Sequence, residues 1–103
     1  MIVTYDNKNK LLKLQMTEEI DHCMAEKIRN KADFEIQKYM PKKVLMDFNN
    51  VSFMDSAGIG MILGRYKMAK MIGGTLQIIN VTTSIKKVLE MSGILKIVKI
   101  VEY

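Results

Sequence analysis

Apolar residues recur along this chain with two different periods, which predicts strands interleaved with helices. Short apolar runs that indicate strands occupy residues 2–5, 11–16, 43–48, 76–79 and 97–101. Helices are indicated where apolar residues recur every three or four positions, at residues 25–39, 57–72 and 85–91. The first helix is expected to begin at Thr17 or Asp21 and to end at Pro41, and the second is expected to end at Gly73-Gly74. The third is expected to begin at Thr82, Thr83 or Ser84 and to end at Gly93.

The resulting order of elements is β-β-α-β-α-β-α-β, which predicts an α/β fold in a single domain spanning residues 1–103. The polar stretch at residues 6–9 predicts a turn, so that the first two strands form an antiparallel hairpin. Later strands alternate with helices, which favours parallel pairing through right-handed crossovers. We therefore expect a mixed sheet of four to five strands, with the helices packed mainly on one face.

The helix at 57–72 has two distinguishable faces. Apolar residues that share the expected core face are Ile59, Ile62, Leu63, Tyr66 and Ala69. Met61, Met68 and Ile72 are expected on the opposite face, with Arg65 nearby. That outer face is either a scatter of surface methionines in a methionine-rich chain or a patch that docks another protein, since methionine adapts to a partner's shape.

Composition narrows the class of protein. The chain has 103 residues, of which 49% are hydrophobic and 26% charged, so it has the composition of a small globular domain. The single cysteine, Cys23, allows no internal disulfide, and neither a signal peptide nor a membrane-spanning stretch is evident, which predicts a cytoplasmic protein without a membrane role. The net charge of +5 comes from scattered basic residues without a nucleic-acid motif, which favours an acidic protein partner over DNA or RNA.

The segment Ser52–Gly60 carries the strongest chemical signal, because it joins a buried strand to a helix and places Ser56 at the expected N-cap. A serine there can simply cap the helix, which stabilises it by about 1 kcal/mol. Alternatively, its hydroxyl can carry a phosphate, which the free N–H groups of a helix N-terminus accommodate. Gly58 and Gly60 favour the second interpretation, since they weaken a helix yet allow another molecule to approach closely.

The sequence gives only weak signals for a nucleotide site, a metal site or a catalytic site. The glycines at 58, 60 and 64 resemble a dinucleotide fingerprint, but the next strand is not followed by the acidic residue that a ribose would need. His22 is the only histidine; its neighbours Asp21 and Cys23 point in other directions on a helix, so neither a zinc site nor a hydrolase dyad is expected. Glu18, Glu19 and Asp21 together are expected to complement the dipole of the first helix.

The sequence Ser52-Phe53-Met54-Asp55-Ser56-Ala57-Gly58-Ile59-Gly60, followed by Ile62-Leu63-Gly64-Arg65-Tyr66-Lys67 and Ile72-Gly73-Gly74, resembles the anti-sigma factor antagonist family, the STAS domain. The likeness extends over essentially the whole chain and is greatest to the sporulation-type antagonists of the anti-sigma-F factor. The resemblance implies a cytoplasmic regulator rather than an enzyme. Its unphosphorylated form binds an anti-sigma factor that is also a serine kinase, and phosphorylation of Ser56 ends the binding until a phosphatase removes the phosphate.

On this interpretation the chain needs no cofactor, because the ATP or ADP belongs to the partner kinase. The residues expected at the interface are Asp21, Asp55, Ser56, Gly58, Ile59, Gly60, Met61 and Arg65. The chain departs from the family pattern in three places: Ala57 stands where a second serine is common, Glu18 where a glycine is usual, and Tyr103 ends the sequence where relatives continue into a further helix. Two alternatives stay open, namely a STAS module of another partner-switching stress response and a small module that binds a nucleotide or lipid.

Overall fold

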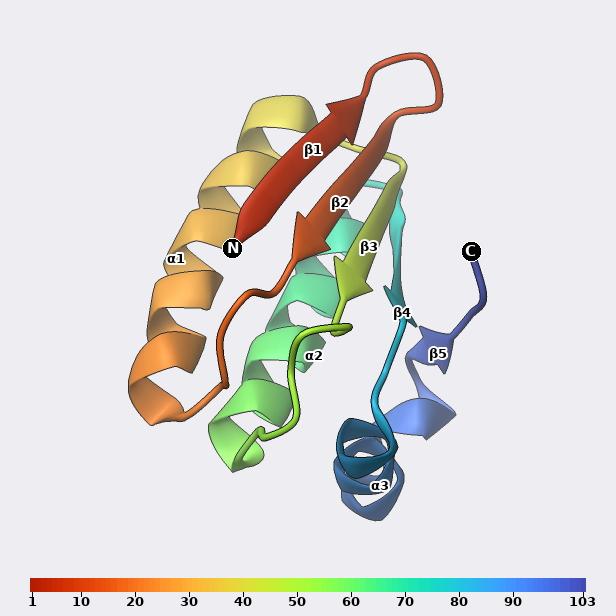
Figure 1. Cartoon of the computed structure of the whole chain (residues 1–103). Helices are drawn as coiled ribbons and strands as arrows, with labels where there is room; N and C mark the ends of the chain where they lie inside the picture. The colour runs from red at the N-terminus through yellow and green to blue at the C-terminus, as the bar shows by residue number, and fades with distance from the viewer.

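Five strands form one mixed sheet in the order β1-β2-β3-β4-β5 in the computed structural model, which describes residues 1–103 (Figure 1). The strands are β1 (Ile2–Asp6), β2 (Leu11–Gln15), β3 (Lys43–Asp47), β4 (Thr75–Ile79) and β5 (Lys99–Ile100). The helices are α1 (His22–Tyr39), α2 (Ser56–Met71) and α3 (Thr83–Ser92), followed by a 3-10 turn, η1 (Ile94–Lys96). The predicted fold class and order of elements are confirmed.

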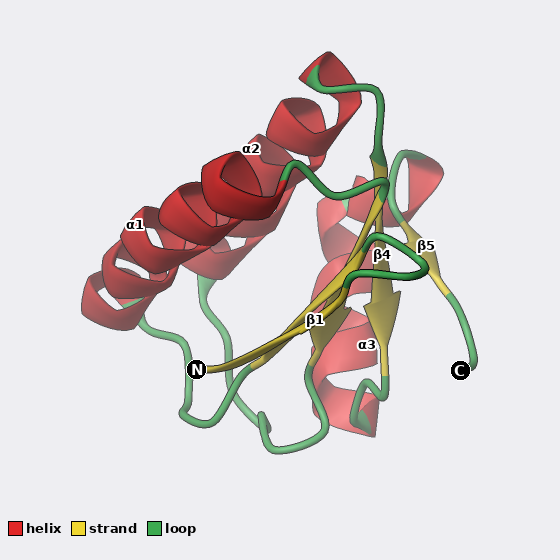
Figure 2. Ribbon diagram, turned by 90° about the horizontal axis from the view of Figure 1, so that it is seen from above, coloured by secondary structure: helices red, strands yellow, loops and turns green.

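The pairing of the strands follows from the connections between them. β1 and β2 are antiparallel, and the turn between them is held by Asp6, whose carboxylate accepts hydrogen bonds from the backbone N–H groups of Lys8 and Asn9. β2, β3, β4 and β5 pair in parallel, each joined to the next through a helical crossover. Viewed from above, α1 and α2 lie side by side on one side of the strands, whereas α3 lies apart from them (Figure 2).

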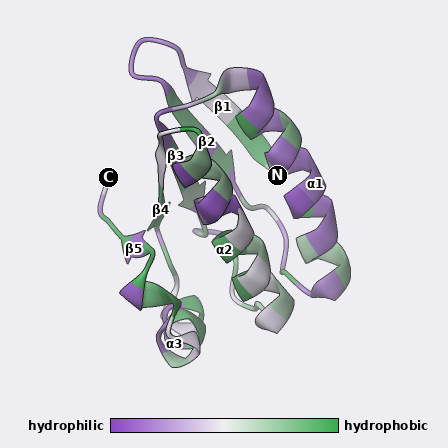
Figure 3. Ribbon diagram, turned by 180° about the vertical axis from the view of Figure 1, so that it is seen from behind, coloured by the Kyte–Doolittle hydropathy of each residue, from purple (hydrophilic) through white to green (hydrophobic).

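The main core lies between the sheet and the helix pair α1 and α2. Alternate positions of neighbouring strands are in register and fully or almost fully buried: Leu12, Val44 and Leu76 in one row, and Leu14, Met46 and Ile78 in the next. The helices add a matching set of buried residues, which includes Ala25, Ile28, Ala32, Ile36, Ile62 and Ala69. The side of α1 that faces away from the sheet is mainly hydrophilic (Figure 3). This amphipathic pattern explains why α1 forms where its periodicity predicts.

The helix ends also follow local chemistry. Asp21 caps α1 by accepting a hydrogen bond from the Met24 N–H at 2.8 Å, and Met40, in the left-handed region with φ 48°, ends it before Pro41. Thr82 caps α3, and Gly93, with φ 79°, closes it. These four ends are as predicted.

The last predicted strand is much shorter than expected. Only Lys99 and Ile100 pair with β4, instead of residues 97–101, because residues 94–96 turn as a 3-10 helix and Val98 is buried in the core.

None of the helices combines the length with the apolar character that crossing a bilayer requires.

Candidate functional site

The N-termini of α1 and α2 are held together by a short parallel β-bridge between Ile20 and Met54, outside the main sheet. The Ile20 N–H donates to the Phe53 carbonyl at 3.0 Å, and the Asp55 N–H donates to the Ile20 carbonyl at 3.1 Å. Two helix N-termini, each with free N–H groups and a partial positive charge, therefore lie together at the same end of the fold.

Ser56 is the first residue of α2, not its N-cap, so the predicted capping role is wrong. Asp55 has the extended conformation of an N-cap (φ −91°, ψ −175°), and its carboxylate accepts a hydrogen bond from the Ala57 N–H at 2.9 Å. With the cap supplied by Asp55, the exposed Ser56 hydroxyl takes part in none of the hydrogen bonds of the fold. A modification of that hydroxyl would therefore break no internal bond.

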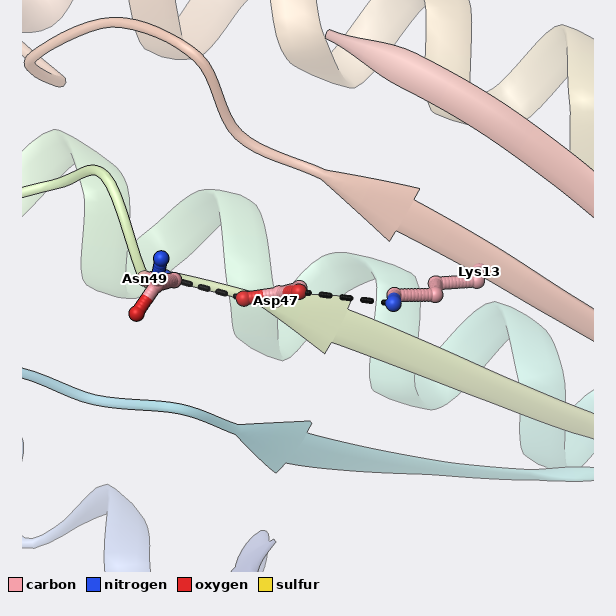
Figure 4. A network of polar contacts seen from close by, with 3 residues as sticks. All are labelled: Lys13, Asp47 and Asn49. Carbon is pink, nitrogen blue, oxygen red and sulfur yellow. Dashed lines mark hydrogen bonds and ion pairs between the residues drawn. The ribbon is translucent and has the colours of Figure 1, made fainter. Parts of the chain in front are cut away.

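The loop between β3 and α2, residues 48–55, is fastened to the rest of the fold at several points. Asp47 lies at its start, 3.6 Å from Lys13 Nζ, and accepts a hydrogen bond from the Asn49 N–H at 2.9 Å (Figure 4). Further along, the Thr82 hydroxyl donates to the Val51 carbonyl at 2.9 Å, which ties the loop to the start of α3. The loop thus reaches Ser56 along a defined path although it has no regular secondary structure.

Glu19 fastens the same loop from the other side. Its carboxylate accepts two hydrogen bonds from Ser52, one from the backbone N–H at 2.9 Å and one from the hydroxyl. The hydroxyl bond and then the backbone bond lower the pKa of Glu19 from its ordinary value. The three acidic residues predicted to act as one cluster thus have separate positions: Asp21 caps α1, Glu19 holds the loop, and Glu18 is exposed without a bond to either.

The two glycines of the motif differ in their surroundings. A Cβ atom on Gly58 would overlap the Met54 side chain and crowd Ile20 at 3.3 Å, so this glycine lets α2 pack closely on its own chain. Gly58 is buried, and the expectation that it leaves room for another molecule is wrong. Gly60 is exposed with open space around it, and Ile59 is half-buried against the core. Only Gly60 leaves room at the surface.

The prediction that Met61 lies on an outer face of α2, with Arg65 nearby, is also wrong, because α1 covers that face. Met61 is 4% exposed and Arg65 is 8% exposed. Arg65 Nε lies 2.8 Å from Asp33 Oδ1, which brings the charges together, although neither atom makes a well-aligned hydrogen bond. Burial lowers the pKa of Arg65, with a smaller lowering from Arg29 and an opposing effect of Asp33. Met61 and Arg65, two of the residues predicted to lie at the interface, are therefore inside the contact between α1 and α2.

A groove with a volume of about 380 Å³ separates the first turns of α1 and α2. It is lined by His22, Ala25, Glu26, Arg29, Ala57, Gly60 and Met61. No group of three or more histidine, cysteine, aspartate or glutamate side chains is placed to hold a metal ion. The groove thus has a mixed polar and apolar lining that includes Ala57, the residue after Ser56.

Three features of the site could not be identified from the sequence. The first is the 53% exposure of Phe53 in the loop between β3 and α2. The other two are the hydrogen bonds of Ser52 with Glu19 and of Val51 with Thr82, which join residues more than thirty positions apart. An exposed aromatic residue has no periodic signal in a loop.

Of the predicted interface residues, the structure brings Asp21, Asp55, Ser56 and Gly60 together at one surface and buries Gly58, Met61 and Arg65 beneath it.

Comparison with known proteins places this arrangement in a family. The STAS domain profile matches residues 2–102, and the chain belongs to the STAS domain family. Within it, the chain is 32% identical to the anti-sigma F factor antagonist of Paenibacillus polymyxa over 98 residues, which cover 95% of this chain and 84% of that one. Two solved structures are also similar, namely the anti-sigma factor antagonist SpoIIAA in its unphosphorylated form (TM-score 0.79) and the Bacillus cell fate determinant SpoIIAA in its phosphorylated form (TM-score 0.70). Each is 26% identical to this chain and covers 92% of it, and the chain covers 81% and 84% of them, respectively.

Proposed function

We propose that this protein is an anti-sigma factor antagonist whose binding is switched by phosphorylation of Ser56. The observation that carries the proposal is the position of Ser56: exposed, first in α2, and with a hydroxyl that the fold does not use. Two similarities support it: one to the anti-sigma F factor antagonist of Paenibacillus polymyxa, and one to the anti-sigma factor antagonist SpoIIAA, which is also solved in a phosphorylated form.

The unphosphorylated surface is the form that binds the anti-sigma factor, which acts as a serine kinase. Asp55 precedes Ser56, Gly60 lies about one helical turn after it, and Asp21 begins the adjacent helix, so a kinase must bring its active site against this surface to reach the hydroxyl. Phosphorylation adds about −1.5 to −2 charges at pH 7. The two helix N-termini make this charge tolerable for the fold itself.

The same phosphate opposes binding of the partner. It lies next to the carboxylate of Asp55, and it faces a kinase site that still holds a negatively charged nucleoside diphosphate after the transfer. Like charges in a contact from which water is excluded repel strongly, so the phosphorylated protein dissociates. A serine phosphatase then restores the hydroxyl. The nucleotide belongs to the kinase, and the protein acts in the cytoplasm without catalysis, nucleic-acid binding or a membrane.

The test is intact-mass measurement of the chain after incubation with a candidate anti-sigma kinase, Mg²⁺ and ATP, followed by peptide mapping. We expect one added phosphate on Ser56 and none on a Ser56→Ala variant. A phosphate elsewhere would move the site, and no phosphate from kinases that are active on another antagonist would overturn the proposal.

A small-ligand module is the second candidate, because the groove between α1 and α2 has room for a small molecule beside Arg29 and His22. Calorimetric titration with nucleotides and with lipid headgroups distinguishes the two functions. Binding at micromolar concentration without a partner protein, abolished by Gly60→Leu, would favour the ligand module.

A further inference from the structure

We infer that Phe53 is an anchor residue for the partner kinase and that Glu19 is a positioning residue that acts through it. The inference rests on the proposed function and names residues of the same surface. Phe53 is 53% exposed, although large aromatic side chains bury much of their area in most folds. The chain on both sides of it is held in place.

The residues beside Phe53 are fixed by contacts with distant parts of the chain. On one side, Ser52 donates two hydrogen bonds to the Glu19 carboxylate. On the other side, Met54 is 3% exposed and pairs with Ile20, and the Phe53 carbonyl itself accepts the hydrogen bond from the Ile20 N–H. The side chain of Phe53 is therefore exposed on a stretch of backbone that these contacts hold in place.

The position of Phe53 relative to Ser56 puts it within reach of a kinase that docks at Ser56. The two residues are three positions apart, so their Cα atoms lie within about 11 Å of each other. An interface of ordinary size buries about 800 Å² on each partner, which corresponds to a disc with a radius of about 16 Å. An interface centred on the Ser56 hydroxyl is therefore wide enough to include Phe53 as well.

A rigid, exposed aromatic side chain is well suited to supply binding energy at such a contact. Aromatic residues are enriched among the few interface positions that dominate affinity. Because the Glu19–Ser52 bonds already order the loop, little conformational entropy is lost when Phe53 enters an apolar socket on the kinase. The kinase should therefore present an apolar socket about one side chain wide beside its active site.

The test uses calorimetric titration of the full chain with the kinase that phosphorylates Ser56, in the presence of ADP. Phe53→Ala should weaken binding at least about tenfold. Phe34→Ala is the matched control, because Phe34 is also exposed (63%) but lies in the second half of α1, about 18 Å along the helix from its first residue, and should change the affinity less than about twofold.

The positioning role of Glu19 is tested by a double-mutant cycle. Glu19→Ala should weaken binding about threefold to tenfold in the parent chain but less than about twofold in the Phe53→Ala background, because the loop then has no anchor to position. Glu18→Ala removes the same charge from the neighbouring residue and should have less than about a twofold effect in either background. Equal effects of Glu19→Ala in both backgrounds would refute the positioning role.

The outcomes separate the inference from the proposed function. Binding by the parent chain with equal losses in Phe53→Ala and Phe34→Ala would overturn the anchor and leave the switch intact. If no anti-sigma kinase binds the parent chain at all, the proposed function fails and this inference fails with it. Thermal unfolding of each variant confirms that the comparison is made between folded proteins.

Discussion

Asp21 and Asp55 are equivalent residues of two adjacent helices: each follows one half of the Ile20–Met54 bridge, and each caps the helix that begins at the next residue. Their backbone angles are nearly identical, with φ −89° and ψ −175° for Asp21 and φ −91° and ψ −175° for Asp55. The cap at Asp55 is what leaves the hydroxyl of Ser56 free.

Asp55→Ala should lower the free energy of unfolding by about 1 kcal/mol, because it removes the acceptor for the Ala57 N–H. Ser56→Ala is the matched control and should change it by less than about 0.5 kcal/mol. Urea denaturation of both variants measures the difference. A larger loss in Ser56→Ala than in Asp55→Ala would mean that Ser56, rather than Asp55, caps α2 in solution.

The two motif glycines should respond to alanine with opposite signs. Gly58→Ala places a Cβ atom against the buried Met54 side chain and should destabilise the fold by about 1–3 kcal/mol. Gly60→Ala has open space and should stabilise α2 by up to about 1 kcal/mol. Both values come from chemical denaturation. A neutral Gly58→Ala would show that Met54 repacks without cost.

The Glu19–Ser52 contact should depend on pH. Since the pKa of Glu19 is lowered in the folded state, its stabilising contribution is fully present above the pKa of an unfolded glutamate, about 4.3, and is lost as the pH falls through the lowered value. An NMR titration of the Glu19 carboxyl carbon and the Ser52 amide measures this. Ser52→Ala removes one of the two hydrogen bonds and should raise the pKa of Glu19 part of the way toward its usual range; an unchanged titration would contradict the contact.

The ion pair between Arg65 and Asp33 should contribute to stability rather than to docking. Asp33→Ala leaves the buried guanidinium without its counter-charge and should cost about 1–3 kcal/mol, below the value for a fully buried pair because the Asp33 side chain is 34% exposed. Adding Arg65→Met to this variant should recover part of the loss, since the unpaired charge is gone. Thermal unfolding of the single and double variants provides the comparison, and an additive further loss in the double variant would argue against the pair.

The phosphorylated state should be imitated in part by a carboxylate. Ser56→Asp should weaken kinase binding, but less than the phosphate does because it carries about half the charge. Ser56→Ala should bind like the parent chain and remain bound in the presence of ATP. Calorimetry with the kinase measures both, and a Ser56→Asp variant with parental affinity would refute the electrostatic basis of release.

Local patterns in the sequence were sufficient to predict most of the fold. The alternation in β2 and the spacing from Ala25 to Ile36 in α1 each depend on one buried face, so their periods are readable directly. The helix α2 is different because both the sheet and α1 cover it. Its buried residues are Gly58, Met61, Ile62, Arg65 and Ala69, which share only Ile62 and Ala69 with the predicted core face. A glycine and an arginine among them give no apolar signal.

Only the part of the candidate site that depends on a single residue, Ser56, could be predicted from the sequence. Ser56 stands out at the junction of strand and helix, but the choice between Asp55 and Ser56 as cap depends on backbone angles that the residue types do not set. The bonds between Glu19 and Ser52 join residues 33 positions apart. Such contacts arise from the packing of the whole chain, so no local pattern reports them.

The cap at Asp55 has a consequence for how this position can change over time. Because no hydrogen bond of the fold uses the exposed side chain at residue 56, threonine or tyrosine at this position would break no internal bond. If Ser56 is the phosphate acceptor as proposed, each exchange would alter the class of kinase that modifies the protein while the scaffold stays the same. The residue type at position 56 can therefore change, in evolution or by design, without a change of the fold.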